Sequence, residues 1–570
     1  MKALFLSILY LFLTTAASAQ MDKKWTALHL LDYSTDADLD RLSLQLPELS
    51  KKGINLLILE VDYNFEFESH PELINGARPI SADGAKSFAA SCKKNNIRLI
   101  PEFQCIGHQS WKQNTASLLK KYPELDLTPG AFPNNDSIYC REWDITNPKV
   151  NEIVFALIDE IVAAFDADGI HLGMDEIFLI GNAKSPATFG KNPAKLLAIA
   201  INEFHDHFVK EKKLQMMIWG DRLIEATQFN YGAWEASAVG TSSAIDMIPN
   251  DIVICDWHYN VRSSYGSIDL FLEKGFKVLP CSYTDVKAAQ ALIKYSFALQ
   301  NQNMLGHCFT TWGAVKKIEL LDFPAMNEGL NTITKEKYFD VSASYVSAKQ
   351  SGEIAVQLKS GKKELAIYYT LDGQTPTTHS QKYNMPLAIQ KGCTLNAMAY
   401  NGEEAAGELF TEEYFIHKGV GNEIHLVHAP SNKYASKNGA ATLLNGISGS
   451  ASFSDGEWVS FEGEDLEAIV TLNPNTTLSS IAMTFHNQVN AWIHHPEKIE
   501  IYSSDDGKNF KLIAEKTQAK IGKQTVTITV DFSATQSKFI KVIAKKTIIP
   551  EGFTGEGHPA WIFVDEIRLQ

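Results

Sequence analysis

The chain has 570 residues, of which 45% are hydrophobic and 21% charged, a composition typical of a globular protein with two to four domains. Its formal net charge of −15 argues against a nucleic acid or an anionic membrane as a partner. The seven Cys are odd in number and widely spaced, so we expect neither a disulfide scaffold nor a metal site, and no cofactor.

The first 19 residues have the pattern of a cleaved secretory signal peptide. Lys2 supplies the positive start, residues 4–13 form an apolar run, and residues 17–19 supply small side chains for cleavage. The apolar run is too short to cross a bilayer, and no later segment is long enough. The sequence therefore predicts a secreted or periplasmic protein without a membrane-inserted segment, and it leaves the oligomeric state open.

Short apolar runs alternate with amphipathic helical stretches from Trp25 to about Gly313. Apolar strands separated by helices are typical of a parallel sheet that is covered on both faces. A doubly wound open sheet would also fit, but no Gly-rich phosphate loop follows the first run. We therefore expect a (β/α)₈ TIM barrel over residues 20–338. The predicted strands are residues 27–31, 54–61, 97–103, 169–173, 214–219, 252–257, 277–281 and 305–311.

Carboxylates and aromatic residues follow most of the predicted strands, at the mouth where TIM barrels place their active sites. Asp175 and Glu176 end the fourth strand as adjacent carboxylates. Aromatic rings cover the apolar faces of a sugar, while carboxylates bind its hydroxyls and supply protons, so the set predicts a sugar pocket. Taken singly, each Trp could equally be a core residue, and Asp175 with Glu176 could be a solvated pair at a helix start.

The pattern changes after about residue 338. Short alternating runs follow, separated by turn signals such as Asp372-Gly373 and Asn401-Gly402. They predict a small antiparallel β-sandwich over residues 339–420. A longer period-two pattern predicts a second β-sandwich over residues 421–570.

Several motifs of the barrel segment occur together and in order. Residues 171–176 are His-Leu-Gly-Met-Asp-Glu. Residues 100–108 contain Ile-Pro-Glu and then Gly-His, and residues 312–313 are Trp-Gly. With these motifs the segment resembles the catalytic domain of glycoside hydrolase family 20, the β-N-acetylhexosaminidases. That family has the fourth-strand pattern His-x-Gly-Gly-Asp-Glu, Ile-Pro-Glu and Gly-His on the third strand, and Trp-Gly on the eighth.

The C-terminal segments carry resemblances of their own. Residues 365–383 resemble the small sandwich that accompanies many hexosaminidases of the chitobiase type. The last unit resembles discoidin-like (factor 5/8 type C) modules, some of which bind sugars. Its role could be scaffolding or sugar binding, and Trp492, His494 and His495 are the candidate sugar contacts.

The resemblance implies an exo-acting enzyme that removes terminal GlcNAc or GalNAc from a glycan with retention. In this family the substrate's own 2-acetamido oxygen attacks the anomeric carbon. By position, Glu176 is the acid/base and Asp175 orients the acetamide, while His108 and Asp62 match a relay behind the acid. Because strand neighbours point to opposite faces, the strand must end or bend at Asp175 for both carboxylates to serve.

The remaining candidate residues would bind the sugar. The resemblance implies that three Trp wall the acetamide pocket and that a Tyr hydroxyl donates to the acetamide oxygen. The substrate-binding candidates are Trp219, Trp257, Tyr283, Trp312, Glu102 and Asp285.

Three positions depart from the family pattern. Met174 replaces the second Gly of the fourth strand, the first strand lacks the family's Arg, and residues 313–315 lack its Glu after the eighth-strand Trp. The last two losses affect the outer hydroxyls of the sugar, so we expect an altered sugar or linkage preference. Arg141 and Glu142 are candidate replacements.

Two other functions fit the same residues. One is a catalytically decayed glycan-binding protein. The other is a two-carboxylate glycosidase that acts on a sugar without a 2-acetamido group and uses Glu102 or Asp62 with Glu176.

Overall fold

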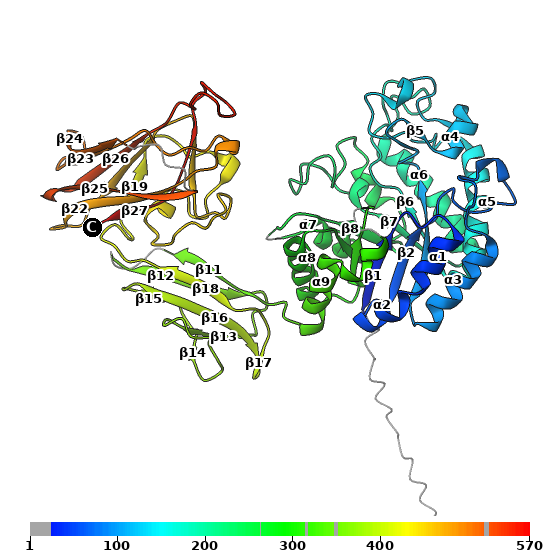
Figure 1. The fold of residues 1–570 in the computed structure, drawn as a ribbon, viewed down its shortest axis with the longest axis horizontal. Coiled ribbons are helices and arrows are strands. Elements are labelled where there is room, and N and C mark those ends of the chain that lie inside the picture. The colour runs from blue at the N-terminus through cyan, green and yellow to red at the C-terminus, as the bar shows by residue number, and fades with distance from the viewer. Residues whose placement is uncertain (1–23, 263, 314–316, 347–351, 518–523) are drawn as a thin grey trace, which may run out of the picture. The chain divides into compact units, whose positions relative to one another are not determined.

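The computed structural model describes residues 24–262, 264–313, 317–346, 352–517 and 524–570 (Figure 1). The predicted signal peptide at residues 1–19 lies outside these ranges. The chain forms two compact units that meet in sequence between Lys335 and Glu336. No helix in the described ranges combines the length and apolar character that a membrane span requires.

The first unit is a closed barrel of eight parallel strands in the order β1-β10-β9-β8-β7-β6-β3-β2. The fold prediction is confirmed, since each predicted apolar run forms a barrel strand. The barrel strands are β1 (Trp25–Leu30), β2 (Leu56–Glu60), β3 (Arg98–Cys105), β6 (Gly169–Gly173), β7 (Gln215–Trp219), β8 (Val253–Trp257), β9 (Lys277–Ser282) and β10 (Gly306–Thr310).

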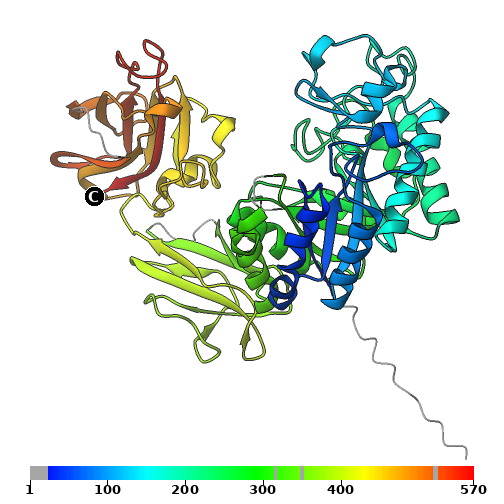
Figure 2. The same cartoon turned by 45° about the vertical axis from the view of Figure 1, so that its right-hand side comes forward.

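Helices surround the barrel, as Figures 1 and 2 show. The strands are therefore buried on both faces; every residue of β6, β8 and β10 is buried. The helices are α1 (Asp36–Ser43), α2 (Leu46–Lys52), α3 (Ala82–Lys94), α4 (Ser117–Lys121), α5 (Pro148–Ala164), α6 (Pro193–His205), α7 (Gly266–Glu273), α8 (Val286–Ala298) and α9 (Pro324–Lys335).

Asn-Pro pairs begin the two helices that flank β6. The Asn147 side chain accepts a hydrogen bond from Lys149 N at the start of α5, and Asn192 accepts from Lys195 N at the start of α6. An Asn cap satisfies a free N–H group, and Pro at the first helical position costs no hydrogen bond. These local signals fix where both helices begin.

A long excursion between β3 and α5 includes the short hairpin of β4 (Ser110–Trp111) and β5 (Asn114–Thr115). Buried Arg141 holds this excursion together. Its guanidinium pairs with Asp126, donates to Asn135 Oδ1, and donates to the carbonyls of Ala131 and Phe132. Arg141 is therefore a structural residue in this arrangement.

The second unit consists of antiparallel β-sheets, as predicted. Its N-terminal part has the sheets β11-β12-β15 and β14-β13-β16-β17, with β18 on β16, and its C-terminal part has β19-β21-β26-β23-β24 and β20-β27-β22-β25. The first group of strands is β11 (Val341–Val346), β12 (Ile354–Ser360), β13 (Ala366–Thr370), β14 (Gln381–Lys382), β15 (Leu387–Ile389), β16 (Cys393–Asn401), β17 (Glu404–Ala405) and β18 (Phe410–Tyr414). The second group is β19 (Ile424–Leu426), β20 (Val459–Glu462), β21 (Leu466–Thr471), β22 (Thr477–His486), β23 (Lys498–Ser504), β24 (Lys511–Thr517), β25 (Thr525–Gln536), β26 (Phe539–Lys545) and β27 (Trp561–Leu569).

Candidate active site

Asp175 and Glu176 follow β6 at the C-terminal mouth of the barrel. The strand ends at Gly173, and the backbone then turns through left-handed conformations at Gly173 (φ 61°), Met174 (φ 68°) and Glu176 (φ 49°). A buried Met with a positive φ is uncommon, and such conformations concentrate at functional sites. The bend that the paired carboxylates require is therefore present.

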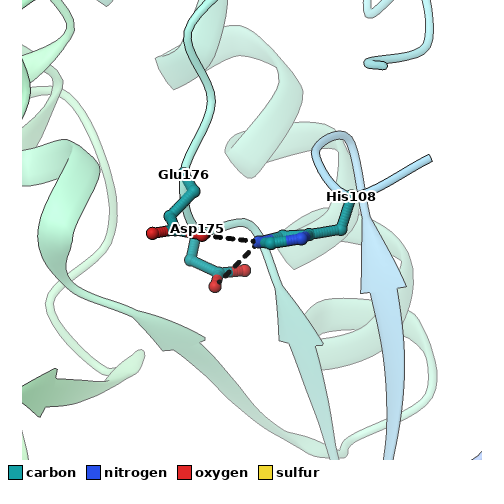
Figure 3. Close-up of side chains that lie close together, drawn as sticks. All are labelled: His108, Asp175 and Glu176. Atoms are coloured by element: carbon teal, nitrogen blue, oxygen red, sulfur yellow. Dashed lines mark ion pairs between the residues drawn. The ribbon is translucent and has the colours of Figure 1, made fainter. Parts of the chain in front are cut away.

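His108 contacts both carboxylates through one ring nitrogen. Its Nε2 is 3.2 Å from Asp175 Oδ2 and 3.2 Å from Glu176 Oε2 (Figure 3). Figure 3 shows the imidazole entering from the segment after β3 and the carboxylates from the segment after β6. Gly107 permits this approach, because a Cβ there would lie 2.6 Å from the carbonyl oxygen of Asp175.

The charges of this cluster support one another. Burial alone would raise the pKa of Asp175, but the His108 imidazole and the Gln104 amide outweigh it and hold that pKa below its ordinary value. Burial would lower the pKa of His108, but Asp175 and Glu176 raise it well above its ordinary value. Asp175 is therefore an anion and His108 a cation near neutral pH.

Gln104 links Asp175 to Asp62. Its Nε2 donates to Asp175 Oδ1 at 2.6 Å, and its backbone N donates to Asp62 Oδ1 at 2.7 Å. The β3–β6 register shifts between Glu102 and Cys105, which re-aims the Gln104 side chain toward β6. Burial raises the pKa of Asp62 to about 7, although the Gln104 N–H group opposes this. The predicted residue Asp62 thus reaches the carboxylate pair through Gln104.

Asp221, two residues after the end of β7, holds the backbone of Glu176. Its Oδ2 accepts a hydrogen bond from Glu176 N at 2.9 Å and pairs with the Arg222 guanidinium, and its Oδ1 accepts from Trp257 Nε1 at 3.4 Å. Burial raises the pKa of Asp221 to about 6, with Arg222 opposing. These contacts hold the backbone of the proposed acid.

Tyr259 joins three of the predicted aromatic residues. Its ring lies 5.0 Å from that of Trp257 and 5.3 Å from that of Tyr283, and its hydroxyl accepts a hydrogen bond from Trp312 Nε1. Trp219 extends this set inward, 5.2 Å from the Trp312 ring, but is only 1% exposed. The four predicted aromatic residues therefore gather at one mouth, with Trp219 deepest.

Glu102 lies beneath the mouth, in the barrel interior. His29 Nε2 donates to Glu102 Oε2 at 2.6 Å, and His171 Nδ1 lies 3.2 Å from Glu102 Oε1. Burial would raise the pKa of Glu102, but the two imidazoles lower it, and Glu102 in turn raises the pKa of His171 to about 10 against burial. Glu102 is fully buried, so in this state it supports the pocket from below.

Asp285 lies at the rim, where its carboxylate accepts a hydrogen bond from Ala288 N at 2.7 Å and caps α8. Its observed contact is therefore structural.

The ligand atoms of His108, Asp175 and Glu176 lie within 4.8 Å of one another, and one nitrogen with two carboxylates could hold a divalent cation. The His108 Nε2 that would bind such an ion already contacts both carboxyl groups.

A surface hollow of about 630 Å³ opens at the opposite mouth of the barrel. It is lined by residues at or just before the starts of strands, including Trp25, Arg98, Asp168 and Gln215. None of the strand-tip residues borders it, so the chemistry of the carboxylate pair belongs to the C-terminal mouth.

A family model described as glycosyl hydrolase family 20, catalytic domain, matches residues 45–339, more than half of the 570-residue chain. The chain belongs to glycoside hydrolase family 20. Further models match the second unit: "Fn3 associated" over residues 356–414 and "F5/8 type C domain" over residues 427–557.

This family 20 chain is similar to a β-hexosaminidase of Emericella nidulans, with 24% identity over 267 residues that span 42% of this chain and 40% of the relative. It thus spans about two-fifths of the length of that curated relative. Among solved structures, a chitobiase of Flavobacterium johnsoniae is 18% identical, with a TM-score of 0.41 over 54% of this chain and 48% of the other. A β-N-acetylhexosaminidase from Bacteroides fragilis is 16% identical, with a TM-score of 0.38 over 54% and 65%.

Within this family 20 barrel, the contacts add residues that are not among the candidates from the sequence. Gln104 is the third-strand residue between Glu102 and the Gly-His pair, and Asp221 and Tyr259 each stand two residues after the end of a predicted strand. Their positions at strand ends were the available signal. Tyr139 lies far from any strand end in the sequence, and only the folded chain brings it to the site.

Proposed function

We propose that this family 20 chain is a secreted or periplasmic β-N-acetylhexosaminidase that removes terminal GlcNAc or GalNAc from glycans. The proposed reaction is retaining and substrate-assisted. The observation that carries the proposal is the anionic Asp175 beside Glu176 at the C-terminal mouth, with His108 Nε2 3.2 Å from each carboxyl group. A terminal N-acetylhexosamine glycan is the proposed partner.

In the first step, the acetamide oxygen of the substrate bonds to C1 and the bond from C1 to the leaving oxygen breaks. Glu176 gives its proton to that leaving oxygen. Asp175 accepts a hydrogen bond from the acetamide N–H, which stabilises the positive charge that develops on the new ring. Gln104 and His108 keep Asp175 ionised for this role.

In the second step, water attacks C1 and the bond to the acetamide oxygen breaks. Glu176, now a carboxylate, takes a proton from the water and returns to its first state. Two displacements at C1 restore the original configuration. His108 Nε2, which lies 3.2 Å from Glu176 Oε2, and Asp221, which accepts a hydrogen bond from Glu176 N, would keep Glu176 in place for both steps.

The surroundings of Glu102 disfavour the two-carboxylate alternative. A nucleophile must contact C1, but both Glu102 oxygens face buried imidazoles and the residue is not exposed. Asp62 remains the other candidate nucleophile.

Arg141 and Glu142, the candidate replacements for the missing family residues, already have partners within the protein. Arg141 pairs with Asp126, and Glu142 Oε1 accepts hydrogen bonds from Phe178 N and Leu179 N. We therefore still propose an altered preference at the outer hydroxyls.

The decisive experiment compares wild type, Glu176→Gln and Asp175→Asn on aryl N-acetyl-β-glucosaminide and -galactosaminide. We expect wild-type turnover, inhibition by a thiazoline analogue, and a fall in kcat/KM of about 100-fold or more in both variants. The exposed Asp206→Asn serves as a control, because its ion pair lies on the helical surface. Equal background rates in all proteins would favour a glycan-binding protein, and trapping by a fluorosugar would favour two carboxylates.

Export is tested separately. The proposal places the mature N-terminus at Gln20, which N-terminal sequencing of the exported protein would identify. Full-length protein retained inside the cell would contradict this part of the proposal.

A further inference from the structure

Four aromatic residues gather beside Glu176 at the barrel mouth. They come from four separate segments, namely the β4 strand, the segment before α5, the segment after β6 and the segment after β7. We call Trp111, Tyr139, Phe178 and Trp234 the aromatic platform. Trp111 is 57% exposed and Trp234 is 53% exposed, so each presents a large part of its ring to solvent.

Tyr139 is the centre of the aromatic platform. Its ring centroid lies 5.0 Å from that of Trp234 and 6.0 Å from those of Phe178 and Trp111. On its inner side it lies 5.7 Å from the His108 ring. The rings therefore form a continuous path from the solvent-exposed rim to the proposed catalytic cluster.

The inner end of the platform lies close to the proposed acid. The Tyr139 ring is 5.7 Å from the His108 ring, and His108 Nε2 is 3.2 Å from Glu176 Oε2. Burial and the Glu176 carboxylate raise the pKa of Tyr139, so the hydroxyl keeps its proton. The leaving group accepts the proton of Glu176 and therefore lies near this end of the platform.

Arg222 holds the outer part of the platform in place. Its guanidinium lies 4.7 Å from the centroid of the Phe178 ring, and its Nη2 donates to the carbonyl of Trp234 at 2.8 Å. The same guanidinium pairs with Asp221, which anchors the backbone of Glu176. The platform and the proposed acid are thus fixed by one network, which favours a preformed binding surface.

We propose that the aromatic platform is the aglycone site, which binds the apolar face of the sugar that follows the cleaved N-acetylhexosamine. This inference rests on the proposed function and narrows its substrate class to oligosaccharides and glycoconjugates with a pyranose next to the cleaved bond. Exposed aromatic rings rimmed by polar groups mark binding surfaces, and rigid rings bind a sugar face at low entropic cost. The rings lead from the solvent-exposed rim to the neighbourhood of Glu176. The sugar that accepts the proton of Glu176 and leaves is therefore the ligand that the platform would bind.

The kinetic test uses two substrates that differ only in the leaving group. One is the N-acetylhexosaminyl fluoride, whose leaving atom cannot stack on the platform. The other is the β-1,4-linked disaccharide with the same terminal sugar. We expect the ratio of kcat/KM for the disaccharide to that for the fluoride to fall about 3- to 10-fold in Trp234→Ala and in Trp111→Ala.

Ile199→Ala is the matched control, because Ile199 is 54% exposed on the outside of α6 and loses a similarly exposed apolar side chain. Its ratio should equal that of wild type, and Trp234→Phe should recover part of the loss. If wild type cleaves both substrates and neither Trp→Ala change alters the ratio, the aglycone site is refuted while the proposed function stands.

A binding measurement separates the two proposals further. Glu176→Gln protein is titrated with N,N′-diacetylchitobiose and with its galactosamine-terminated counterpart by calorimetry, alone and combined with Trp234→Ala. Binding that weakens about 3- to 10-fold on loss of Trp234 supports the platform, even if wild type cleaves nothing. Absence of binding, or binding that is independent of Trp234, overturns it.

Discussion

At the scale of residues, neighbours of opposite charge set the ionisation of the site. Asp175 is buried yet anionic because His108 and Gln104 contact its carboxylate. Glu102 is anionic in the barrel interior because two imidazoles flank it. In both places burial would favour the neutral acid, and specific partners reverse that preference.

Glu102→Gln is expected to destabilise the barrel by about 3 kcal/mol at pH 7, because it leaves two buried imidazoles without their anion. The His171 pKa is raised from 6.5 to about 10, so the stabilisation by its ion pair with Glu102 is complete below pH 6.5 and is lost as the pH rises to about 10. The free energy of unfolding of the wild type should therefore fall between pH 7 and pH 10, and that of the variant should change less over this range. Urea unfolding at several pH values measures the free energy of unfolding of both proteins.

Glu48→Gln is the control for this change, because its ion pair with Lys51 is exposed and contributes little. A Glu102→Gln protein with the wild-type slope between pH 7 and pH 10 would show that His171 is not held charged by Glu102.

At the scale of elements, the site depends on how β3 and β6 end. The register shift between the two strands aims Gln104 at Asp175, and the left-handed turn after β6 brings Asp175 and Glu176 to one cluster. Gly173 is the position where both features meet. A Cβ there would lie 2.0 Å from Gln104 Oε1.

Gly173→Ala is expected to displace the Gln104 amide and to lower kcat/KM on N-acetylhexosaminides by about 100-fold. Gly190→Ala is the matched control: its φ of 75° carries the same backbone cost, but no heavy atom lies within 4 Å of the added Cβ. Both should lose about 1 kcal/mol of stability from the left-handed backbone. Equal kcat/KM in the two variants would refute the positioning role of Gln104.

At the scale of the whole molecule, the two compact units have separate hydrophobic cores. The barrel interior is packed by residues such as Leu56, Ile58 and Ile100, and the C-terminal sandwich by residues such as Phe461 and Phe485. Each core is built from strands of its own unit. Separate cores favour separate unfolding.

Scanning calorimetry should therefore resolve a barrel transition that is separate from the unfolding of the second unit. Trp458 is fully buried in the C-terminal unit, with its ring 5.1 Å from that of His486. Trp458→Ala should destabilise that unit by about 3 to 5 kcal/mol and leave the barrel transition unchanged. Leu57→Ala, in buried β2, should move the barrel transition alone. Joint movement of both transitions in either variant would show that the units unfold together.

Much of the fold could be predicted because its signals are local. The barrel strands are buried on both faces, so they appear as apolar runs, and Asp175 with Glu176 appears at the end of one. The sequence indicates Trp257, Tyr283 and Trp312 for the same reason, since parallel strands end at a common mouth. The sequence alone therefore determined the barrel, its catalytic edge and the family resemblance.

Only the tertiary structure decided which partners each side chain has. Gln104 meets Asp175, Asp221 meets the Glu176 backbone, and Tyr139 meets Trp234, although each pair lies tens of residues apart. Glu102 appeared as a sugar contact from its strand position, but the fold surrounds it with imidazoles. Ionisation and contact depend on distance and burial in three dimensions, which the spacing of residues along the chain does not encode.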